Sequence, residues 1–556
     1  MIFRALPAVF ALLAGLLLTR APAAAGVTYY IDARAGNDDA EGTDPQRAFK
    51  SLARASRLHL RAGDAVRLAA GQTHPGSLTL AAPSGSATEP VVIGSYSPAG
   101  ARTDASGGDR AVIDARGQAN AIKITDGRHV VVRDMVIEAD GGGLPAAEAR
   151  TTTMRCGVLV DTSRPGDYGA IALENLWIRR VYFEDAGFRR SPGEVRTANG
   201  TQRYGWGIRF INQTPGARLS DLTVRGSRIE MTEHTGIKFT APVDGIRDVK
   251  VVDNVVERTG GPGIQLSGVT GGHFRGNRVD RSGDASDSRQ WGRGSGLWTW
   301  SCTDILIEHN RFTNANGPGD SAGCHIDFNC RNVIVQYNVS ANNAGGFCEI
   351  LGNNYNCAYR YNLSVNDGHR VKGQAGAFQE GKILWLSGYV GARRDPSGPF
   401  NSYIYNNTIY TSAELVAKVA FGASARGVLI ANNIFYLEGA SALVGGDQNR
   451  AEHLPATAIE PLVFSHNLFL REDNWPAAAP VRDAQPLFGD PGFARAGGLE
   501  PADYVPSNAG LVRDRGLELQ PLPGDPAGLA GGLAVTHDLL GRPIVGRPDL
   551  GAIELP

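Results

Sequence analysis

The chain has 556 residues, with 71 glycines, only 4 methionines and a formal net charge of −1 at pH 7. This length exceeds one ordinary hydrophobic core and favours several domains or a repeat architecture. The near-zero charge excludes the strongly basic surface that is typical of nucleic-acid-binding proteins and of proteins that adhere to anionic membranes. We therefore expect no nucleic-acid partner, and the glycine content favours a protein rich in strands and turns.

Residues 1–25 read as a secretory signal peptide. Arg4 gives a positive start, an apolar run extends to Leu18, and Ala23 and Ala25 form a small-x-small cleavage signal. The alternative is a membrane anchor, but the apolar run is short for a span, and no later segment is long and apolar enough to cross a bilayer. We predict a secreted or periplasmic protein without a membrane span, cleaved after Ala25.

Residues 26–105 form an opening segment that leads into the repeats. It contains KSLARASRLHL from Lys50 to Leu60, which we interpret as a helix that caps the open end of a repetitive core.

Residues 106–480 carry a repeated pattern: a short apolar strand, then asparagine, an apolar residue and a polar tail. Copies include DNVVERT at Asp253, HNRFTNA at His309 and YNLSVND at Tyr361. Successive asparagines are 23, 33, 28 and 24 residues apart, at Asn254, Asn277, Asn310, Asn338 and Asn362. Spacings in this range are typical of solenoids.

The strands indicate which solenoid this is. Segments such as NVIVQYN are rich in Val and Ile, helical periodicity is absent between them, and no leucine ladder is present. Asparagine at a fixed turn position suits a left-handed backbone conformation and can hydrogen-bond from coil to coil. We predict an all-β, right-handed parallel β-helix with three short strands per coil, stacked about 4.8 Å apart.

Two terminal motifs carry a family resemblance. The opening YYIDARAGNDDAEGTDPQRAFKSLARAS and the closing DLLGRPIVGRPDLGAIEL resemble those of the pectate-lyase-like superfamily. The resemblance implies a carbohydrate substrate but no single reaction, because the superfamily contains lyases, hydrolases, epimerases and phage tailspikes. The chain lacks the NTD…DD…GHG…RIK series of polygalacturonases and the aspartate-proline-histidine-aspartate motif of alginate epimerases.

Five successive coils align on a glycine that opens a strand, as in GIRF at Gly207 and GCHIDF at Gly323. Because side chains alternate along a strand, the residue after each glycine points inward and the next points outward. The first outward column is then Arg209, Lys238, Gln265, Trp298 and His325, and the second is Ile211, Thr240, Ser267, Trp300 and Asp327.

Two outward tryptophans on one strand expose apolar area that a solvated face would avoid. We interpret Trp298 and Trp300 as subsites that stack on sugar rings, with Arg209, Gln265 and His234 as further substrate contacts. The structural alternative is that a long loop covers both tryptophans.

Asp327 and Glu349 are the candidate catalytic pair, in either order of acid and nucleophile. Aligning Cys348 with Ile326 places Glu349 beside Asp327, with carboxyls about 5 Å apart as in retaining glycosidases. Such closeness would raise one pKa, as a general acid needs. An alignment fixed on Asn362 would instead set Glu349 opposite His325. A calcium site and a solvated acidic ladder are the competing interpretations.

The leading hypothesis is a secreted glycoside hydrolase, in which His325 and Lys238 orient the substrate. The first alternative is a polysaccharide lyase, which would use Lys238, His325 or Arg209 as the base. The second alternative is a glycan-binding β-helix without catalysis. Arginine-rich loops before this face suit an acidic polysaccharide. We expect a monomer that requires no cofactor, with Ca²⁺ possible.

The six cysteines have no CxxC spacing, which argues against a zinc site. Cys302 and Cys330 each lie 8 residues before a repeat asparagine, so neighbouring coils could join them in a disulfide. Cys324 and Cys348 both point inward, as packed thiols or a second bridge. We interpret all the cysteines as structural. Residues 481–556, rich in proline and glycine, are predicted to form an irregular C-terminal cap.

Overall fold

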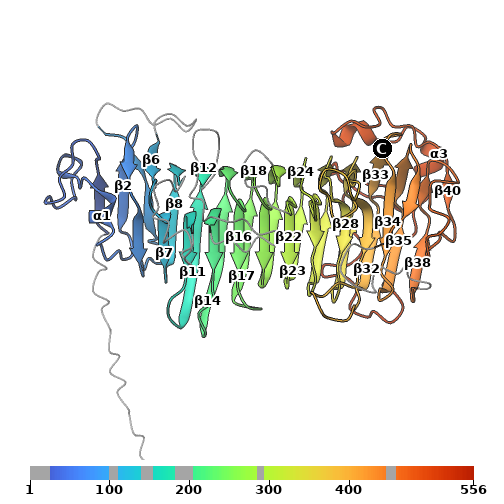
Figure 1. Ribbon diagram of the computed structural model, residues 1–556, viewed down its shortest axis with the longest axis horizontal. Helices are drawn as coiled ribbons and strands as arrows, with labels where there is room; N and C mark the ends of the chain where they lie inside the picture. Colours follow the sequence, from blue (N-terminus) through green and yellow to red (C-terminus); the bar gives the residue numbers. More distant parts are fainter. Residues whose placement is uncertain (1–25, 99–109, 140–154, 182–203, 285–292, 446–458) are drawn as a thin grey trace, which may run out of the picture.

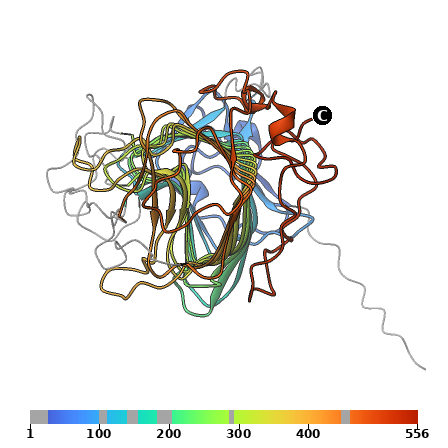
Figure 2. The same ribbon diagram turned by 90° about the vertical axis from the view of Figure 1, so that its right-hand side faces the viewer.

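The computed structural model describes residues 26–98, 110–139, 155–181, 204–284, 293–445 and 459–556. The chain winds into an elongated stack of coils, with its N-terminal strands at one end and its C-terminal strands at the other (Figure 1). Viewed along the stack, the coils enclose one continuous interior (Figure 2). The predicted signal peptide, residues 1–25, lies outside the described residues.

The described strands form three long parallel sheets of 14, 12 and 14 strands. Sheet A consists of β1 (Thr28–Ile31), β2 (Ala65–Ala69), β5 (Val91–Tyr96), β8 (Arg128–Arg133), β11 (Gly166–Glu174), β14 (Ala217–Arg225), β17 (Ile246–Val252), β20 (Val269–Arg275), β23 (Thr303–Glu308), β26 (Arg331–Gln336), β29 (Tyr355–Arg360), β32 (Phe400–Tyr405), β35 (Arg426–Ala431) and β38 (Leu462–Ser465).

Sheet B consists of β3 (Thr73–Pro75), β6 (Ala111–Asp114), β9 (Met135–Glu138), β12 (Trp177–Val181), β15 (Arg228–Thr232), β18 (Val255–Thr259), β21 (Arg278–Ser282), β24 (Arg311–Thr313), β27 (Val339–Ala341), β30 (Leu363–Val365), β33 (Thr408–Thr411), β36 (Ile434–Leu437), β39 (Leu468–Phe469) and β40 (Leu487–Phe488).

Sheet C consists of β4 (Leu78–Ala81), β7 (Asn120–Thr125), β10 (Arg155–Asp161), β13 (Tyr204–Ile211), β16 (Ile237–Thr240), β19 (Ile264–Ser267), β22 (Leu297–Trp300), β25 (Cys324–Ile326), β28 (Gly346–Ile350), β31 (Lys382–Leu386), β34 (Ala417–Phe421) and β37 (Ser441–Leu443). The arrangement confirms the predicted right-handed parallel β-helix.

The core follows from the alternation of side chains along each strand. On β13 and β16 the inward residues Ile208, Phe210, Ile237 and Phe239 are fully buried, and the Phe210 and Phe239 rings stack 4.9 Å apart. One hydrophobic cluster extends without a break from Ile31 to Val481, so the opening segment and the coils share a single core. Each such buried side chain contributes about 1.5–3 kcal/mol to folding.

The repeat asparagines form the predicted ladder between coils. The Asn310 backbone N–H donates to Asn338 Oδ1 at 2.8 Å, and the Asn338 N–H donates to Asn362 Oδ1 at 2.9 Å. Side-chain amides continue the ladder through Asn254, Asn277, Asn310, Asn338, Asn362, Asn407, Asn433 and Asn467.

The left-handed backbone conformation belongs to the residue before each ladder asparagine, which corrects the prediction. Asp253, His309, Tyr337 and Tyr361 have φ between +52° and +56°. The residue before the asparagine therefore adopts the left-handed conformation of the turn. The asparagine side chain then satisfies buried backbone groups of the preceding coil, as Asn338 does for the Asn310 N–H and the Ile307 carbonyl.

All six cysteines are free and buried, so the disulfide prediction was wrong. Stacking does bring Cys302 and Cys330 together, and the Cys302 backbone N–H donates to Cys330 Sγ at 3.5 Å. The thiols pack among apolar side chains of the core, as small hydrophobic residues do.

The N-terminal cap is shorter than predicted. Within Lys50–Leu60 only α1 (Leu52–Ala55) is an α-helix, and the 3-10 helix η1 (Pro45–Arg47) precedes it. The Ser51 side chain caps α1, and Phe49 and Leu52 are buried against the first coils. Among the described residues, no helix is long and apolar enough to cross a membrane.

The C-terminal segment covers one side of the stack in addition to following its end. Trp475 packs on Phe435, Phe464 and Phe469 and closes the core. The chain then runs back through η3 (Pro501–Tyr504) and α3 (Ala509–Val512) along the outer side of sheets A and B (Figure 2). An ion pair of 3.0 Å joins Arg311 on β24 to Glu500 in this segment.

Candidate active site

The outer side of sheet C carries the column predicted from the sequence. Parallel pairing places Arg209 level with Lys238, then Gln265, Trp298 and His325 in turn. We call the outward side chains of β13 to β31 the sheet C face.

Glu349 lies two residues away in register from where the leading alignment placed it, so it stays on the outer face. Ile326 pairs with Ile350, which sets Glu349 level with His325 and not with Asp327. The prediction that Asp327 and Glu349 are direct neighbours was therefore wrong, and the alignment on Asn362 was right. An additional glycine opens β28 at Gly346 and misled the glycine-based alignment.

Three buried carboxyls lie near enough at this point of the sheet C face to influence one another's pKa values. Asp327 follows β25, Glu349 lies on β28, and Asp320 belongs to the loop before β25. Their exposed fractions are 9%, 4% and 5% respectively. The charge of Asp320 raises the pKa of both other carboxyls, and the charge of Asp327 raises that of Glu349. Closely placed carboxyls cannot all ionise together.

Asp320 is the ionised member of the group. Burial alone would raise its pKa, but the guanidinium of Arg293, 2.6 Å from Asp320 Oδ1, holds the pKa below the usual range. Its loop is fixed by Arg370, which donates to the carbonyls of Asp320 at 2.8 Å and Gly317 at 3.0 Å. The Asp320 backbone N–H also donates to Gln379 Oε1.

Asp327 and Glu349 hold their protons near neutral pH. Burial, reinforced by the charge of Asp320, raises the pKa of Asp327 to about 7 and that of Glu349 to about 8. The site thus contains one ionised and two largely protonated carboxyls at pH 6. Environments that move the pKa values of neighbouring carboxyls apart are typical of acid–base sites.

His325 is neutral. Burial lowers its pKa to about 4, its Nδ1 lies 2.9 Å from Ser295 Oγ, and its ring stacks on Trp298 with centroids 5.5 Å apart. A neutral imidazole on the sheet C face can donate or accept a hydrogen bond without adding charge.

Aromatic rings surround the carboxyls. Trp300 is the most open of them, with 38% of its surface exposed, and its ring contacts Phe328, which contacts Tyr389 in turn. On β31, Trp385 lies level with Glu349 and carries the ammonium of Lys382 3.9 Å above its ring.

Several polar atoms of the sheet C face are buried without a hydrogen-bond partner. Among the described residues they include Thr240 Oγ1, Gln265 Oε1 and Glu349 Oε1. Such atoms cost free energy when they are left unpaired and are uncommon in folded proteins. Their position on one face of one sheet indicates a surface prepared for a polar ligand.

The other end of the column is basic. Arg209 and Lys238 both lie over the buried ring of Trp206, at 4.0 and 5.9 Å from its centroid. His234 packs against the same ring and is only 1% exposed, in a turn after β15. His234 lies beside the basic end of the column, and its role as a substrate contact stays a prediction.

Metal chemistry has no evident centre in the described residues. Among them, no three or more His, Cys, Asp or Glu side chains are arranged to hold a metal ion. Arg293 forms an ion pair with Asp320, and Asp327 and Glu349 have raised pKa values that favour their protonated forms. The calcium interpretation stays a prediction.

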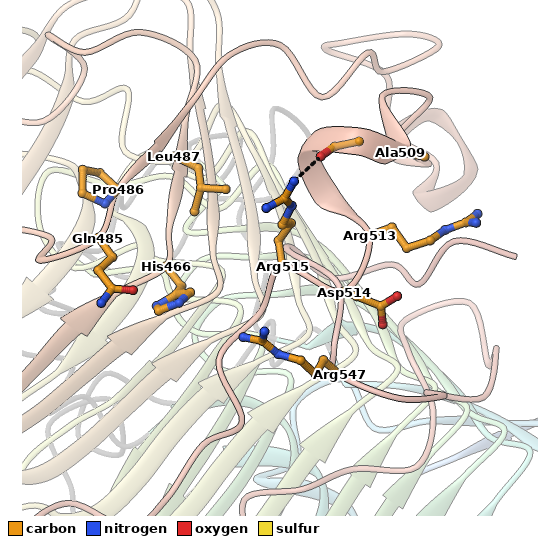
Figure 3. Close-up of a pocket in the computed structure, with 10 residues that line it drawn as sticks. His466, Gln485, Pro486, Leu487, Ala509, Arg513, Asp514, Arg515 and Arg547 are labelled. Carbon is orange, nitrogen blue, oxygen red and sulfur yellow. Dashed lines mark hydrogen bonds between the residues drawn. The ribbon is translucent and has the colours of Figure 1, made fainter.

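A cavity of about 750 Å³ lies elsewhere, between the last coils and the C-terminal segment (Figure 3). His466, Arg513, Arg515 and Arg547 contribute to its lining, and Asp514 is the one carboxyl among the described residues that line it. Arg515 is turned toward α3, where it donates to the Gly510 carbonyl at 3.2 Å. Size alone would favour this cavity, but its described lining lacks the paired carboxyls that define an acid–base site.

Sequence reasoning missed Asp320, Arg293, Arg370 and Trp385. The first three come from connections outside the repeated strands, in segments without a copy elsewhere in the chain. Trp385 could have been found by extending the outward column beyond Glu349 in the register set by Asn362.

Comparisons with known proteins support the fold. No protein-family model matches the chain. It is 24% identical over 645 residues to the lacto-N-biosidase of Bifidobacterium longum subsp. longum, in an alignment that covers 96% of this chain and 37% of that protein. The crystal structure of GH136 lacto-N-biosidase from Eubacterium ramulus is 22% identical, with a TM-score of 0.52 over 70% of this chain and 64% of that one.

This chain is a parallel β-helix protein. It spans little more than a third of the length of the curated relative that it matches. The similarity to the crystal structure extends to the fold, and the activity must be argued from the sheet C face.

Proposed function

We propose that this protein is a glycoside hydrolase that acts on a glycan bound along the sheet C face. The observation that carries the proposal is the group of three buried carboxyls, Asp320, Asp327 and Glu349, with pKa values moved in opposite directions. The similarity to proteins named lacto-N-biosidases supports the same reaction class.

Glycoside hydrolysis needs one protonated and one ionised carboxyl beside the scissile bond. The protonated carboxyl gives its proton to the leaving oxygen, and the ionised one attacks the anomeric carbon or activates water. Asp327 and Asp320 meet this requirement together at neutral pH. We therefore propose Asp320 and Asp327 as the reacting pair, with Glu349 as a neutral neighbour that donates a hydrogen bond to the substrate.

This pairing revises the pair predicted from the sequence. Asp327 and Glu349 both have raised pKa values, so both are largely protonated at pH 6 and neither supplies the negative charge. Asp320 supplies it because Arg293 keeps this carboxyl ionised in a buried setting.

The substrate would lie along the axis of the stack. Strands in a sheet are about 4.8 Å apart, close to the length of one sugar residue, so each outward side chain of the column can serve one subsite. Trp298 and Trp300 would stack on sugar rings next to the cleaved bond, and His325 would orient a hydroxyl. We take lacto-N-biose-containing glycans as the first substrates to test, because of the name of the matched relatives.

The test is hydrolysis of p-nitrophenyl lacto-N-bioside by the mature wild-type chain and by Asp320→Asn, Asp327→Asn and Glu349→Gln. The matched control is Asp167→Asn, whose side chain is 83% exposed. Loss of activity in both aspartate variants, and not in the control, supports the pair. The configuration of the glycosyl azide formed with added azide assigns the two roles in a retaining enzyme: an inverted product marks the variant that lacks the nucleophile, and a retained product marks the variant that lacks the acid/base. Full activity of both aspartate variants would refute the site.

A polysaccharide lyase is the second candidate, and Lys238 is the observation that favours it. Burial and the neighbouring charge of Arg209 lower the pKa of Lys238 to about 7, which suits a base beside a cation that neutralises a uronate. Ultraviolet absorbance from an unsaturated product on uronate glycans would support this reaction. Binding of glycans without any turnover would leave the non-catalytic alternative.

We also propose that the mature protein is secreted or periplasmic and is a monomer. The signal-peptide pattern of residues 1–25 supports export. N-terminal sequencing of the exported protein should begin at Gly26, and light scattering should give the mass of one chain. Retention in the cytoplasm with an intact N-terminus would contradict export.

A further inference from the structure

We propose that the sheet C face binds a glycan that carries an anionic substituent, and that Lys238 and Arg209 hold this substituent about three sugar residues from the cleaved bond. The inference rests on the proposed function and adds the chemical class of the substrate to it. The substituent would be a uronate carboxylate or a sulfate ester, because both present the same charge and acceptor oxygens.

The position follows from the strand pairing. Lys238 on β16 lies in the same outward column as His325 on β25, with β19 and β22 between them. Three strand steps correspond to about 14 Å along the stack. A glycan laid along the column from the carboxyl group would therefore bring its third or fourth residue over Lys238.

The two cations are held at one place by a shared platform. Both lie over the ring of Trp206, which is itself fixed in a cluster with Cys156, Leu159 and Ile211. The nearby charge of Arg209 and burial both disfavour the charged form of Lys238. An anion bound between the two cations would favour that charged form, and this is the condition for a selective anion site.

Lys123, in the same column, is a lysine with a structural role whose charge is neutralised by a neighbouring carboxylate of the protein. It lies on β7 and forms a 3.2 Å ion pair with Asp161, which also accepts from Thr125 Oγ1. Among the described residues, no carboxylate lies within ion-pair distance of Lys238. The described residues thus supply a counter-charge at one lysine of the column and none at the other, and we assign that role to a ligand.

The surface between Lys238 and the carboxyls suits a sugar chain. Thr240 Oγ1 and Gln265 Oε1 are buried without hydrogen-bond partners on the two strands that connect the basic end to Trp298. Sugar hydroxyls can donate to both atoms, so the polar floor continues from the basic end to the reacting carboxyls.

The test is calorimetric binding in an Asp327→Asn background, so that hydrolysis does not interfere. The probes are a chondroitin tetrasaccharide, its sulfated form and its carboxyl-reduced neutral form. We expect the charged tetrasaccharides to bind about tenfold more tightly than the neutral form. Replacing Lys238 by Met should weaken charged binding about 10- to 100-fold and leave the neutral form unchanged.

Three controls make the result specific. Lys123→Met should not change binding. Lys238→Arg should retain the preference for charged tetrasaccharides. Without ligand, Lys238→Met should unfold at a higher temperature than the wild-type protein, because the substitution removes a buried like charge beside Arg209. A preference for the sulfated over the unsulfated form would identify a sulfate ester. The opposite preference, or none, would identify the carboxylate.

Equal binding of charged and neutral tetrasaccharides, no binding of charged ones, or an unchanged preference in Lys238→Met would each overturn the inference. An unsaturated product from wild-type protein would also overturn it, by making Lys238 a base. Hydrolysis of p-nitrophenyl lacto-N-bioside by the wild-type protein tests the proposed function separately, so the two failures can be told apart.

Discussion

The outer sides of sheets A and C carry similar polar side chains, but the two faces differ in whether these side chains find hydrogen-bond partners. On sheet A the C-terminal segment satisfies them: Tyr405 Oη donates to the Leu533 carbonyl at 2.7 Å, Arg360 Nη1 donates to that of Gly532 at 2.8 Å, and Tyr403 Oη donates to Asp525. On sheet C, no described residue hydrogen-bonds to the buried Gln265 Oε1 or Glu349 Oε1. Within the described part of the chain, the protein thus satisfies the polar groups of one face and not those of the other, as our proposal of a ligand on the sheet C face requires.

The largest effect should come from removing the proton donor of the sheet C face. Asp327→Asn should lower kcat about 10³-fold, because general acid–base catalysis contributes about 10²–10⁴-fold. Kinetics on a lacto-N-biose-containing oligosaccharide measure this loss, because its sugar leaving group needs a proton whereas p-nitrophenolate leaves with little protonation. The circular dichroism spectrum should stay unchanged, and a variant that retains more than a tenth of the wild-type rate would remove Asp327 from the mechanism.

The pH dependence of activity should distinguish the protonated and the ionised carboxyl of the sheet C face. Asp327 acts protonated, so activity should fall about tenfold per pH unit above its pKa of about 7. Asp320 acts ionised, so activity should also fall once the pH drops below its lowered pKa. A plot of kcat/KM against pH from 3 to 10 should be bell-shaped, with its alkaline limb centred near pH 7. A flat profile up to pH 9 would contradict the assignment of Asp327 as proton donor.

Trp298→Ala should raise KM by about tenfold with a smaller change in kcat, because stacking on the sugar contributes mainly to binding. The control is Trp475→Phe, which lies in the core closure at the end of the stack and should leave KM unchanged. Equal effects of both substitutions on KM would show that Trp298 acts through folding.

The sheet A side should respond in stability and not in activity. Asp525 accepts hydrogen bonds from Asn356 Nδ2 at 2.7 Å and from Tyr403 Oη, so Asp525→Ala leaves two buried donors unpaired. We expect the free energy of unfolding to fall by about 1–3 kcal/mol, with kcat/KM unchanged at 25 °C. Urea denaturation measures the first quantity. A loss of activity greater than threefold would mean that the two faces are coupled.

The dependence of stability on pH should reveal the free-energy cost of the sheet C face itself. The raised pKa of Asp327 means that the unfolded chain releases this proton at lower pH than the folded chain, so stability falls between pH 4 and 7. Asp327→Asn removes that loss and should stabilise the protein at pH 8, by on the order of 2–4 kcal/mol at most, and not at pH 3.5. Thermal unfolding at both pH values checks the sign, and destabilisation at pH 8 would contradict it.

The repeat made much of this architecture predictable. Period-two alternation, counted from the glycine that opens each strand, was enough to place Arg209, Lys238, Gln265, Trp298 and His325 in one column, because each coil repeats the same backbone path. The register failed at Glu349, where an additional glycine shifts the start of β28, and the asparagine ladder was the more reliable guide since its hydrogen bonds fix the stacking.

The remaining features depend on segments that do not repeat. Asp320 and Arg293 come together through two separate connections, and their 2.6 Å ion pair has no signature in the spacing of the sequence. The return of the C-terminal segment along sheets A and B likewise depends on tertiary packing of residues such as Leu522 and Leu533. The predicted disulfide failed because stacked cysteines pack equally well as free thiols in an apolar core.

A crystal structure of Asp327→Asn with a bound lacto-N-biose-containing oligosaccharide would test the central claim most directly. We expect the sugar chain along β16 to β31, stacked on Trp298 or Trp300. One glycosidic oxygen should lie within hydrogen-bond distance of the substituted side chain at position 327, with the Asp320 carboxylate beside the adjoining anomeric carbon. A sugar chain bound in the arginine-lined cavity near α3, with the sheet C face empty, would contradict the account.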